Sequence, residues 1–265
     1  MSNARDFASR VPVDGALSNR NLIINGAMQV AQRGTSFTTQ PNNTYGIDRW
    51  LNENDAAAFN LDIEQTSGPA DEGFPYSLKA TVQTTTTLSA TGYLIPFEQR
   101  IEYGNIKHLA FGTSKAKSLV VSFWIKSNRT GSYTVDMTKG GPTKAVIMPY
   151  TINSADVWEK KSLAIPPDAV DAISGTVTLF WWMIAGSNYT SGTTQSEWGA
   201  QFAANRAVGC SNSTTAGDYW QITGVQLEVG DTATEFEHEP YSVTLQKCQR
   251  YYEILSRATS SSSYG

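Results

Sequence analysis

Alternation of apolar and polar residues is the main pattern of the chain between about residues 21 and 237. In its clearest example, SLVVSFWIKSN, one strand face carries Leu119, Val121, Phe123 and Ile125. The opposite face places Trp124 between Ser122 and Lys126. A period of two predicts β-strands, and turn-forming residues separate the runs at intervals typical of a sandwich or a barrel. The pattern therefore predicts an all-β, antiparallel body.

Further strand-like runs fill most of this region, at residues 21–34, 45–54, 59–66, 76–84, 131–140, 144–152, 175–186 and 218–230. In the first run, Asn25 and Gly26 mark a turn or a bulge. The polar stretch from 186 to 218 is unusually long for a loop in a compact domain. We expect its aromatic residues Tyr189, Trp198 and Phe202 to hold it against the body, with one or two strands inside it.

The spacing of apolar residues changes to three and four near the C-terminus. Leu245, Cys248, Tyr252 and Leu255 form one stripe on a predicted helix, and Ser242 stands where a helix cap is expected. A stripe this short does not hold a helix alone in water. The helix therefore packs on the body or on copies of itself, and the 3-4-3 spacing fits a coiled-coil seam. The sequence leaves both alternatives open.

Residues 1–20 are polar and have the composition of an extended arm. Isolated apolar residues within the arm are candidates for burial in a partner, namely Phe7, Val11, Val13 and Leu17. A terminus without fixed structure is the alternative. We accordingly divide the chain into an arm (1–20), a sandwich (21–239) and a helix with a polar tail (240–265).

Composition and charge exclude several classes of partner. The 265 residues suit one large all-β domain or two small domains, and the net charge of -4 comes from interspersed acids and bases. A nucleic-acid footprint or an anionic membrane site needs a basic stripe, which is missing. No apolar stretch approaches the roughly 20 residues that span a bilayer, and the first 20 residues have no signal-peptide core. We expect no nucleic-acid partner, no membrane insertion and no secretory signal.

The cysteines and histidines do not suggest a metal site. Cys210 and Cys248 are the only cysteines, and free thiols are expected, with a disulfide as the alternative. His108 and His238 are far apart, and no Cys/His cluster has zinc spacing. We expect no cofactor.

Four phrases resemble a module found in bacteriophage tail-fibre and other virion proteins. They are NLIINGAMQVAQRGTSF, YGIDRW, VSFWIKS and YWQITGVQLEVGDTATEFEHEPYSVTLQKCQRYYE, within residues 11–253. The phrases NLIINGAM, VSFWIKS and VQLEVG also resemble the carbohydrate-binding jelly-roll modules of families 4, 9 and 22. The resemblance implies a two-sheet antiparallel jelly roll in a homotrimeric virion structural protein that touches a host-surface glycan.

The resemblance also implies roles for the three parts of the chain. In a tail fibre or spike, the arm would dock on other virion proteins. The sandwich would act as a spacer or as a binding domain, and the helix would hold three copies in register. Alternatives are a head fibre or capsid decoration protein of the same fold, or a stand-alone carbohydrate-binding module.

A structural calcium ion is a feature of the carbohydrate-binding modules. In those modules an acidic residue often follows the N-G pair, whereas this chain has Ala27 and Met28 there. Calcium needs several oxygen ligands, and Asp48 and Glu228 are the only candidates that we name.

Sugar recognition requires flat apolar faces and polar groups that bond to hydroxyls. The candidate residues are Trp124, Trp182, Trp198, Tyr189 and Tyr150. Trp124 and Trp182 each lie opposite the main apolar face of their strand, so they would share a sheet face if their strands were neighbours. The alternative is core or loop packing, since tryptophans are highly buried on average.

The chain lacks the phrases of known catalytic sites, and we expect no enzymatic activity. Glycosidases use paired carboxylates, but the acids here are scattered over turns. No G-x-S-x-G elbow is present, and no second histidine follows His238. Its neighbours Glu235, Glu237 and Glu239 are expected to form a solvated charge cluster.

Overall fold

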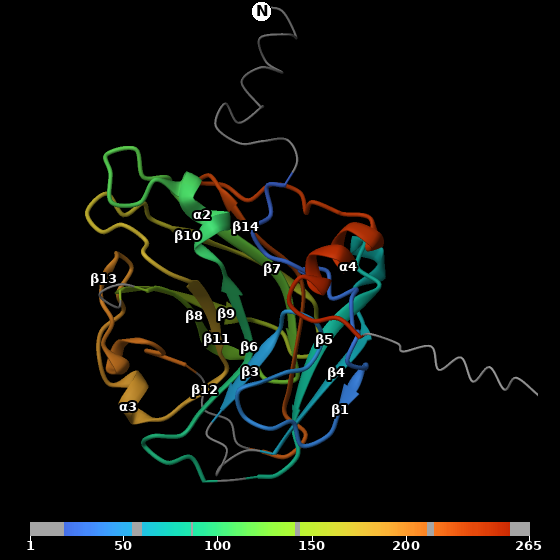
Figure 1. The fold of residues 1–265 in the computed structure, drawn as a ribbon. Helices are drawn as coiled ribbons and strands as arrows, with labels where there is room; N and C mark the ends of the chain where they lie inside the picture. Colours follow the sequence, from blue (N-terminus) through green and yellow to red (C-terminus); the bar gives the residue numbers. More distant parts are fainter. Residues whose placement is uncertain (1–18, 55–59, 86, 141–143, 211–214, 255–265) are drawn as a thin grey trace, which may run out of the picture.

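The protein is an antiparallel β-sandwich with two sheets packed face to face (Figure 1). The computed structural model describes residues 19–54, 60–85, 87–140, 144–210 and 215–254. In spatial order, the six strands of sheet A are β1 (Ser36–Phe37), β4 (Leu61–Ser67), β5 (Tyr76–Val82), β14 (Tyr219–Val229), β7 (Leu119–Ser127) and β10 (Glu159–Ile165).

Sheet B has eight strands and forms the other layer. In spatial order they are β13 (Gly199–Ala200), β9 (Lys144–Ile152), β8 (Gly131–Lys139), β11 (Val177–Trp182), β6 (Tyr93–Ile101), β3 (Leu51–Asn54) and β2 (Thr44–Tyr45), and β12 (Ile184–Ala185) also pairs with β6. The chain crosses from one sheet to the other at β1–β2, β3–β4, β5–β6, β6–β7, β7–β8, β9–β10, β10–β11 and β13–β14. Such repeated crossing between two antiparallel sheets is the winding of a jelly roll, so the predicted fold class is confirmed.

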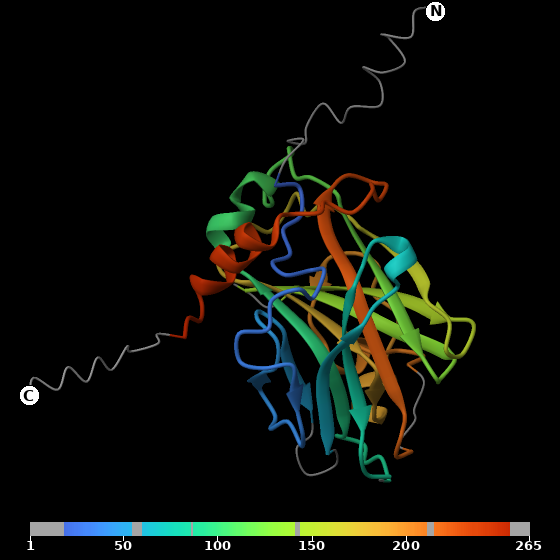
Figure 2. The same ribbon diagram turned by 90° about the vertical axis from the view of Figure 1, so that its right-hand side faces the viewer.

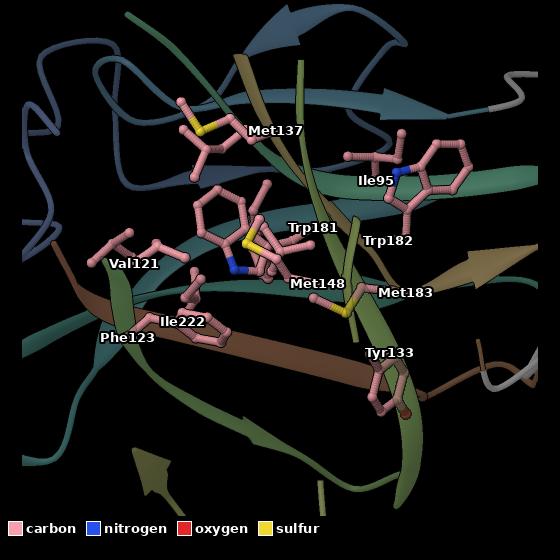
Figure 3. Close-up of a cluster of buried hydrophobic side chains, with 14 of the residues drawn as sticks. Ile95, Val121, Phe123, Tyr133, Met137, Met148, Trp181, Trp182, Met183 and Ile222 are labelled. Atoms are coloured by element: carbon pink, nitrogen blue, oxygen red, sulfur yellow. The ribbon is translucent and has the colours of Figure 1, made fainter. Parts of the chain in front are cut away.

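The core lies between the sheets and contains a chain of aromatic rings. Trp181 of sheet B lies 5.7 Å from Trp50 and 5.8 Å from Phe123 of sheet A, and Phe123 lies 5.3 Å from Tyr150. Figure 3 shows Trp181 in the middle of this cluster and Trp182 toward its rim. The four rings of the chain are buried, and burying a large apolar side chain contributes about 1.5–3 kcal/mol. The aromatic chain thus joins the two sheets.

Strand β7 shows how the alternation in the sequence becomes packing. Its predicted apolar face is entirely buried in the core, as expected for Leu119, Val121, Phe123 and Ile125. On the opposite face, Trp124 and Lys126 are half-buried. Because β14 and β10 pair with β7 on either side, this outer face belongs to the centre of a continuous surface.

The helices are short and lie at the ends of the sandwich. They are α2 (Tyr103–Ile106), α3 (Ser187–Thr190) and α4 (Tyr241–Gln249), with 3-10 turns η1 (Ala70–Glu72), η2 (Lys107–Leu109) and η3 (Ala203–Asn205). Figure 2 shows α2, α4 and the first described residues gathered at one end. None of the helices in the described ranges is long and apolar enough to cross a membrane.

The prediction of a strand at residues 21–34 is wrong, because this segment is a series of turns. Asn25 and Met28 have φ angles of 61° and 57°, which interrupt an extended strand. The Asn25 side chain holds the turn by donating to the carbonyl oxygens of Val30 and Asp48, both at 2.9 Å. The expected turn at Asn25-Gly26 is therefore confirmed.

Candidate functional site

The outer face of sheet A carries a hollow of about 130 Å³, which we call the Trp124 hollow. Its lining residues are Glu72, Phe74, Ser122, Trp124, Lys160, Gly224, Glu235, Phe236 and His238. Alternation along β7 turns Trp124 outward, and pairing places it opposite Lys160 of β10 and Thr223 of β14. The floor of the hollow is therefore built on three adjacent strands.

A β-bulge shapes one side of the hollow. The register between β14 and β7 shifts between Thr223 and Gln226, and Gly224 within the bulge has a φ of 59°. A Cβ at Gly224 would lie only 2.7 Å from Cζ of Phe74. Glycine thus allows the Phe74 ring to lie directly on the strand, as bulges often do beside functional sites.

Phe74 is one of three rings that form an aromatic wall. Its centroid lies 5.0 Å from Phe236 and 5.3 Å from His238, and the last two rings are 4.9 Å apart. Phe74 precedes β5, whereas Phe236 and His238 follow β14, so distant parts of the sequence build the wall together. The packed rings hold the wall in one geometry.

The ionisable side chains that line the hollow do not form ion pairs with one another. Within the described residues, no ion pair involves Glu72, Glu235, Lys160 or His238. Such groups can accept or donate hydrogen bonds to a ligand, and the half-buried Trp124 ring adds a flat apolar surface. A few polar groups converging on an aromatic surface are typical of a small-molecule site.

Sheet B carries a second polar cluster, which we call the sheet-B charge row. Phe180 pairs with Glu98 on one side and Asp136 on the other, so the three residues stand in line across β6, β11 and β8. Arg100 Nε lies 2.5 Å from Glu98, and Arg206 Nε lies 2.6 Å from Asp136. Both carboxylates are fully buried.

The buried carboxylates of this row have altered acidity. Burial raises the pKa of Glu98 to about 7, although the adjacent Arg100 opposes this rise. Burial likewise raises the pKa of Asp136, against the opposing effect of Arg206. The Arg206 guanidinium also lies 4.7 Å above the rings of Phe180 and Trp182. Through Arg206, the row therefore attaches the segment around η3 to sheet B.

The structure separates the residues predicted to bind sugar. Trp124 belongs to sheet A and Trp182 to sheet B, so their strands are not neighbours and the condition for a shared face is not met. Alternation gives the face of a residue within its own strand but not the sheet that the strand joins. Trp182 is 1% exposed and Tyr150 is 6% exposed, so both are packing residues.

The two loop aromatics also have structural contacts. Tyr189 lies 5.1 Å from Trp182 and 5.4 Å from Tyr93. The Trp198 indole donates to the carbonyl of Pro166 at 2.7 Å and packs 5.7 Å from Phe111. Of the five predicted sugar-binding residues, only Trp124 lines the hollow.

The carboxylates of both calcium candidates already accept hydrogen bonds from neighbouring protein groups. Asp48 accepts from the backbone and side chain of Gln32 at 2.7 and 2.6 Å, with Arg33 3.7 Å away. Glu228 accepts from Gln226 and from two groups of Thr234. Among the described residues, no three His, Cys, Asp or Glu side chains form a metal-binding group. The two carboxylates do not fit a calcium site.

The C-terminal helix packs on the sandwich. Cys248 faces the body and is 1% exposed, and Leu245 is half-buried. The helix ends at Gln249, so Tyr252 lies beyond it and does not belong to the predicted helical stripe. Pro240 occupies the N-cap position expected for Ser242. Leu255 and the arm residues Phe7, Val11, Val13 and Leu17 lie outside the described residues.

Sequence reasoning missed the aromatic wall and misassigned the acidic cluster beside it. Glu237 accepts from the backbone of Asn21 at 2.9 Å, Glu239 pairs with Lys247, and Glu235 lines the hollow, so the three do not form one solvated cluster. The alternation of Phe236 and His238 after the last strand was the available signal. The expectation of thiols outside a disulfide is confirmed, since neither Cys210 nor Cys248 forms a disulfide bond in the described structure, and both are buried.

Comparison of the chain with protein-family models and with curated proteins finds no match. Among solved structures, a family 4 carbohydrate-binding module is similar over 78% of this chain and 99% of its own, at 11% identity and a TM-score of 0.42. The xylan-binding CBM22-1 domain of Paenibacillus barcinonensis Xyn10C is 12% identical over 75% of this chain and 94% of its own, with a TM-score of 0.38. The enzymatically active domain of tailspike protein 4 from bacteriophage CBA120 is 15% identical over 80% of this chain but only 22% of its own, with a TM-score of 0.40. At these identities and TM-scores, the similarities assign no ligand to the chain.

Proposed function

We propose that the protein is a bacteriophage virion structural protein, a tail-fibre or spike component, that binds a host-surface glycan without catalysis. The observation that carries the binding part is the Trp124 hollow, where an aromatic surface and unpaired polar groups meet. The virion part is supported by the sequence phrases within residues 11–253 that resemble virion proteins.

The chemistry of the hollow suits a sugar ring. The Trp124 face covers the C–H surface of a pyranose, Glu72 and Glu235 accept from hydroxyls, and Lys160 and His238 donate to ring and hydroxyl oxygens. A volume of about 130 Å³ limits the contact to about one sugar unit. Single-unit contacts are weak, but several copies on one particle raise the avidity by orders of magnitude.

We further propose that three copies assemble, and that residues 1–20 dock on other virion proteins. The face of α4 that holds Cys248 packs on the body of its own chain, so it is not available to other copies. Tyr241 and Val243, which are 53% and 38% exposed, are the large apolar side chains of the helix that remain exposed for contacts between copies. Native mass spectrometry at micromolar concentration tests this assembly, and a stable monomer would contradict it.

A glycan array of host polysaccharides tests the binding function. Trp124→Ala should reduce retention on the bound glycan by about tenfold or more, which corresponds to about 1.4 kcal/mol. Trp158→Ala is the matched control, because Trp158 is a half-buried tryptophan near sheet A that lies outside the hollow and contacts Lys126. Equal loss in both variants, or no binding of any host polysaccharide by the native protein, would refute the glycan function. Labelling the protein on intact particles would test its place in the virion.

A further inference from the structure

A larger pocket lies at the end of the sandwich where the first and last described segments meet. Figure 2 shows α2 and α4 at this end. We call it the end pocket. Its volume is about 280 Å³, and its lining residues are Asn19, Asn21, Leu22, Ile24, Asn105, His108, Lys247, Arg250 and Tyr251. None of these residues lines the Trp124 hollow, so the two sites are separate.

The N-terminal wall of the end pocket is held by backbone and amide hydrogen bonds. The Asn21 side chain donates to the Val225 carbonyl at 3.0 Å and accepts from the backbone N–H groups of Ile23 and Leu227. Leu22 N–H donates to the carbonyl of Leu227 at 2.9 Å. Asn21 thus ties the segment to β14, and the wall exists before any ligand arrives.

The opposite wall is formed by the end of α4 and is also anchored. Tyr251 packs beneath Arg49, whose guanidinium carbon lies 3.6 Å from the ring centroid. Arg250 pairs with Glu102, the residue before α2, at 2.5 Å. These two contacts connect the end of α4 to the body and hold this wall of the pocket in place.

The polar lining of the end pocket is positive and rich in donors. Among the described residues, Lys247, Arg250 and His108 line it, and no carboxylate does. Glu239 and Glu102, which pair with Lys247 and Arg250, lie outside the lining. An ammonium has three N–H donors and a guanidinium has five, so each cation keeps donors free for a ligand after making its ion pair.

The remaining lining residues select among anions. Leu22 and Ile24 add a half-buried apolar strip, and Asn19 and Asn105 add amide groups that can bond to hydroxyls. Burial and the nearby Lys117 lower the pKa of His108, so at neutral pH its ring offers one donor and one acceptor. A bare inorganic anion would bind to the cationic side chains but would contact neither the apolar strip nor the amide groups.

We propose that the end pocket binds an acidic monosaccharide unit, with its carboxylate on Lys247 and Arg250 and its hydroxyls on the amides and His108. The volume lies near the lower end of the roughly 300–1,000 Å³ range of drug-sized ligand sites, which suits one sugar ring rather than an extended chain. Guanidinium and carboxylate groups also form the strong, charge-assisted hydrogen bonds that orient such a ligand. The proposal is independent of sugar binding at the Trp124 hollow.

Titration calorimetry of the full chain with three probes tests the proposal. Sodium D-glucuronate should bind, and D-glucose and sodium phosphate should each bind about tenfold more weakly or worse. The double variant Lys247→Gln/Arg250→Gln should weaken glucuronate binding by about tenfold, with each single variant changing it in the same direction. The control Lys115→Gln removes an exposed lysine that does not line the pocket, and it should bind normally.

Three kinds of result would overturn the proposal: binding of the wrong probe, unchanged binding in the pocket variants, and lost binding in the hollow variant. Equal binding of glucose would show that the carboxylate is not recognised, and equal binding of phosphate would reduce the pocket to a simple anion site. Unchanged glucuronate binding in folded Lys247 and Arg250 variants would place the ligand elsewhere. If Trp124→Ala lost glucuronate binding, the glucuronate site would be the Trp124 hollow and not the end pocket. If the Trp124 hollow bound no glycan at all, the result at the end pocket would not be affected.

Discussion

Arg33 lies over the ring of Tyr252, with 3.5 Å between its guanidinium carbon and the ring centroid. The backbone carbonyl of Tyr252 also accepts from Gln32 Nε2 at 2.9 Å. These contacts join the turn segment near the start of the chain to the residues after α4. Because α4 has only nine residues, it depends on such anchors rather than on its own hydrogen bonds.

Tyr252→Ala should therefore loosen α4 without unfolding the sandwich. Cation–π contacts contribute about 0.5–2 kcal/mol, so amide exchange in residues 241–252 should become about twofold to thirtyfold faster. Hydrogen exchange with mass spectrometry measures this change, with β8 peptides as the internal control. Arg33→Ala should act in the same way, and the double variant should lose less than the sum of the single losses. Unchanged exchange in both single variants would contradict the anchoring role.

Gly26 should be indispensable to the fold because its backbone contacts β14. A Cβ at this position would lie 2.1 Å from the carbonyl oxygen of Val225. A backbone carbonyl cannot move away from an added methyl group as a flexible side chain can. Gly26→Ala should therefore lower the free energy of unfolding by about 2–4 kcal/mol. Gly104→Ala is the matched control, since a Cβ there meets nothing within 4 Å. Urea unfolding measures both, and similar midpoints for the two variants would contradict the close approach.

Much of the fold follows from the local pattern, and its failures have local causes. The alternation in β7 predicts its buried face because a half-buried strand needs period two. Strand β6 was not predicted from the sequence, and it contains Pro96, which cannot donate to a sheet ladder. At 21–34 the apolar content resembles a strand, but positive φ angles at Asn25 and Met28 give turns.

The candidate site was less predictable than the fold because its parts come from distant segments. Trp124 could be proposed from its outward position in β7. Its neighbours Glu72 and His238 are 166 residues apart, and their proximity depends on which strands become neighbours in sheet A. The separation of Trp124 from Trp182 has the same origin, because the pairing of strands is a long-range property.

The buried Glu98 should make stability depend on pH. Its pKa is raised from 4.5 to about 7 in the folded protein, so between these values the folded state holds a proton that the unfolded state has released. The free energy of unfolding should therefore fall as pH rises from about 4.5 to 7, by at most about 3 kcal/mol at roughly 1.4 kcal/mol per pH unit. Thermal unfolding across this range measures the slope. Glu98→Gln should flatten it, with a residual slope in the same direction from Asp136. An equal slope in Glu98→Gln would contradict the assignment.

Lys139 is a buried, ion-paired lysine, and replacing it should have a large effect on the free energy of unfolding. It is 2% exposed at the end of β8, where its ammonium contacts the Asp168 carboxylate and the carbonyl of Asp171. The ammonium also lies 5.0 Å from the Trp198 ring. Removing one partner of a buried pair leaves an uncompensated charge, so Lys139→Ala should lower the free energy of unfolding by about 3–5 kcal/mol.

Lys144→Ala is the natural control for Lys139→Ala, because Lys144 pairs with Asp171 nearby but is far more exposed. Solvent already stabilises exposed charges, so its loss should matter much less. A Lys139→Met/Asp168→Asn variant should recover most of the stability lost in Lys139→Ala, since it removes both charges and restores volume. Midpoints of urea unfolding compare the three variants. If Lys139→Ala and Lys144→Ala were equally stable, the charge of Lys139 would be solvated in the folded protein, and Trp198 would not be sealing it from water.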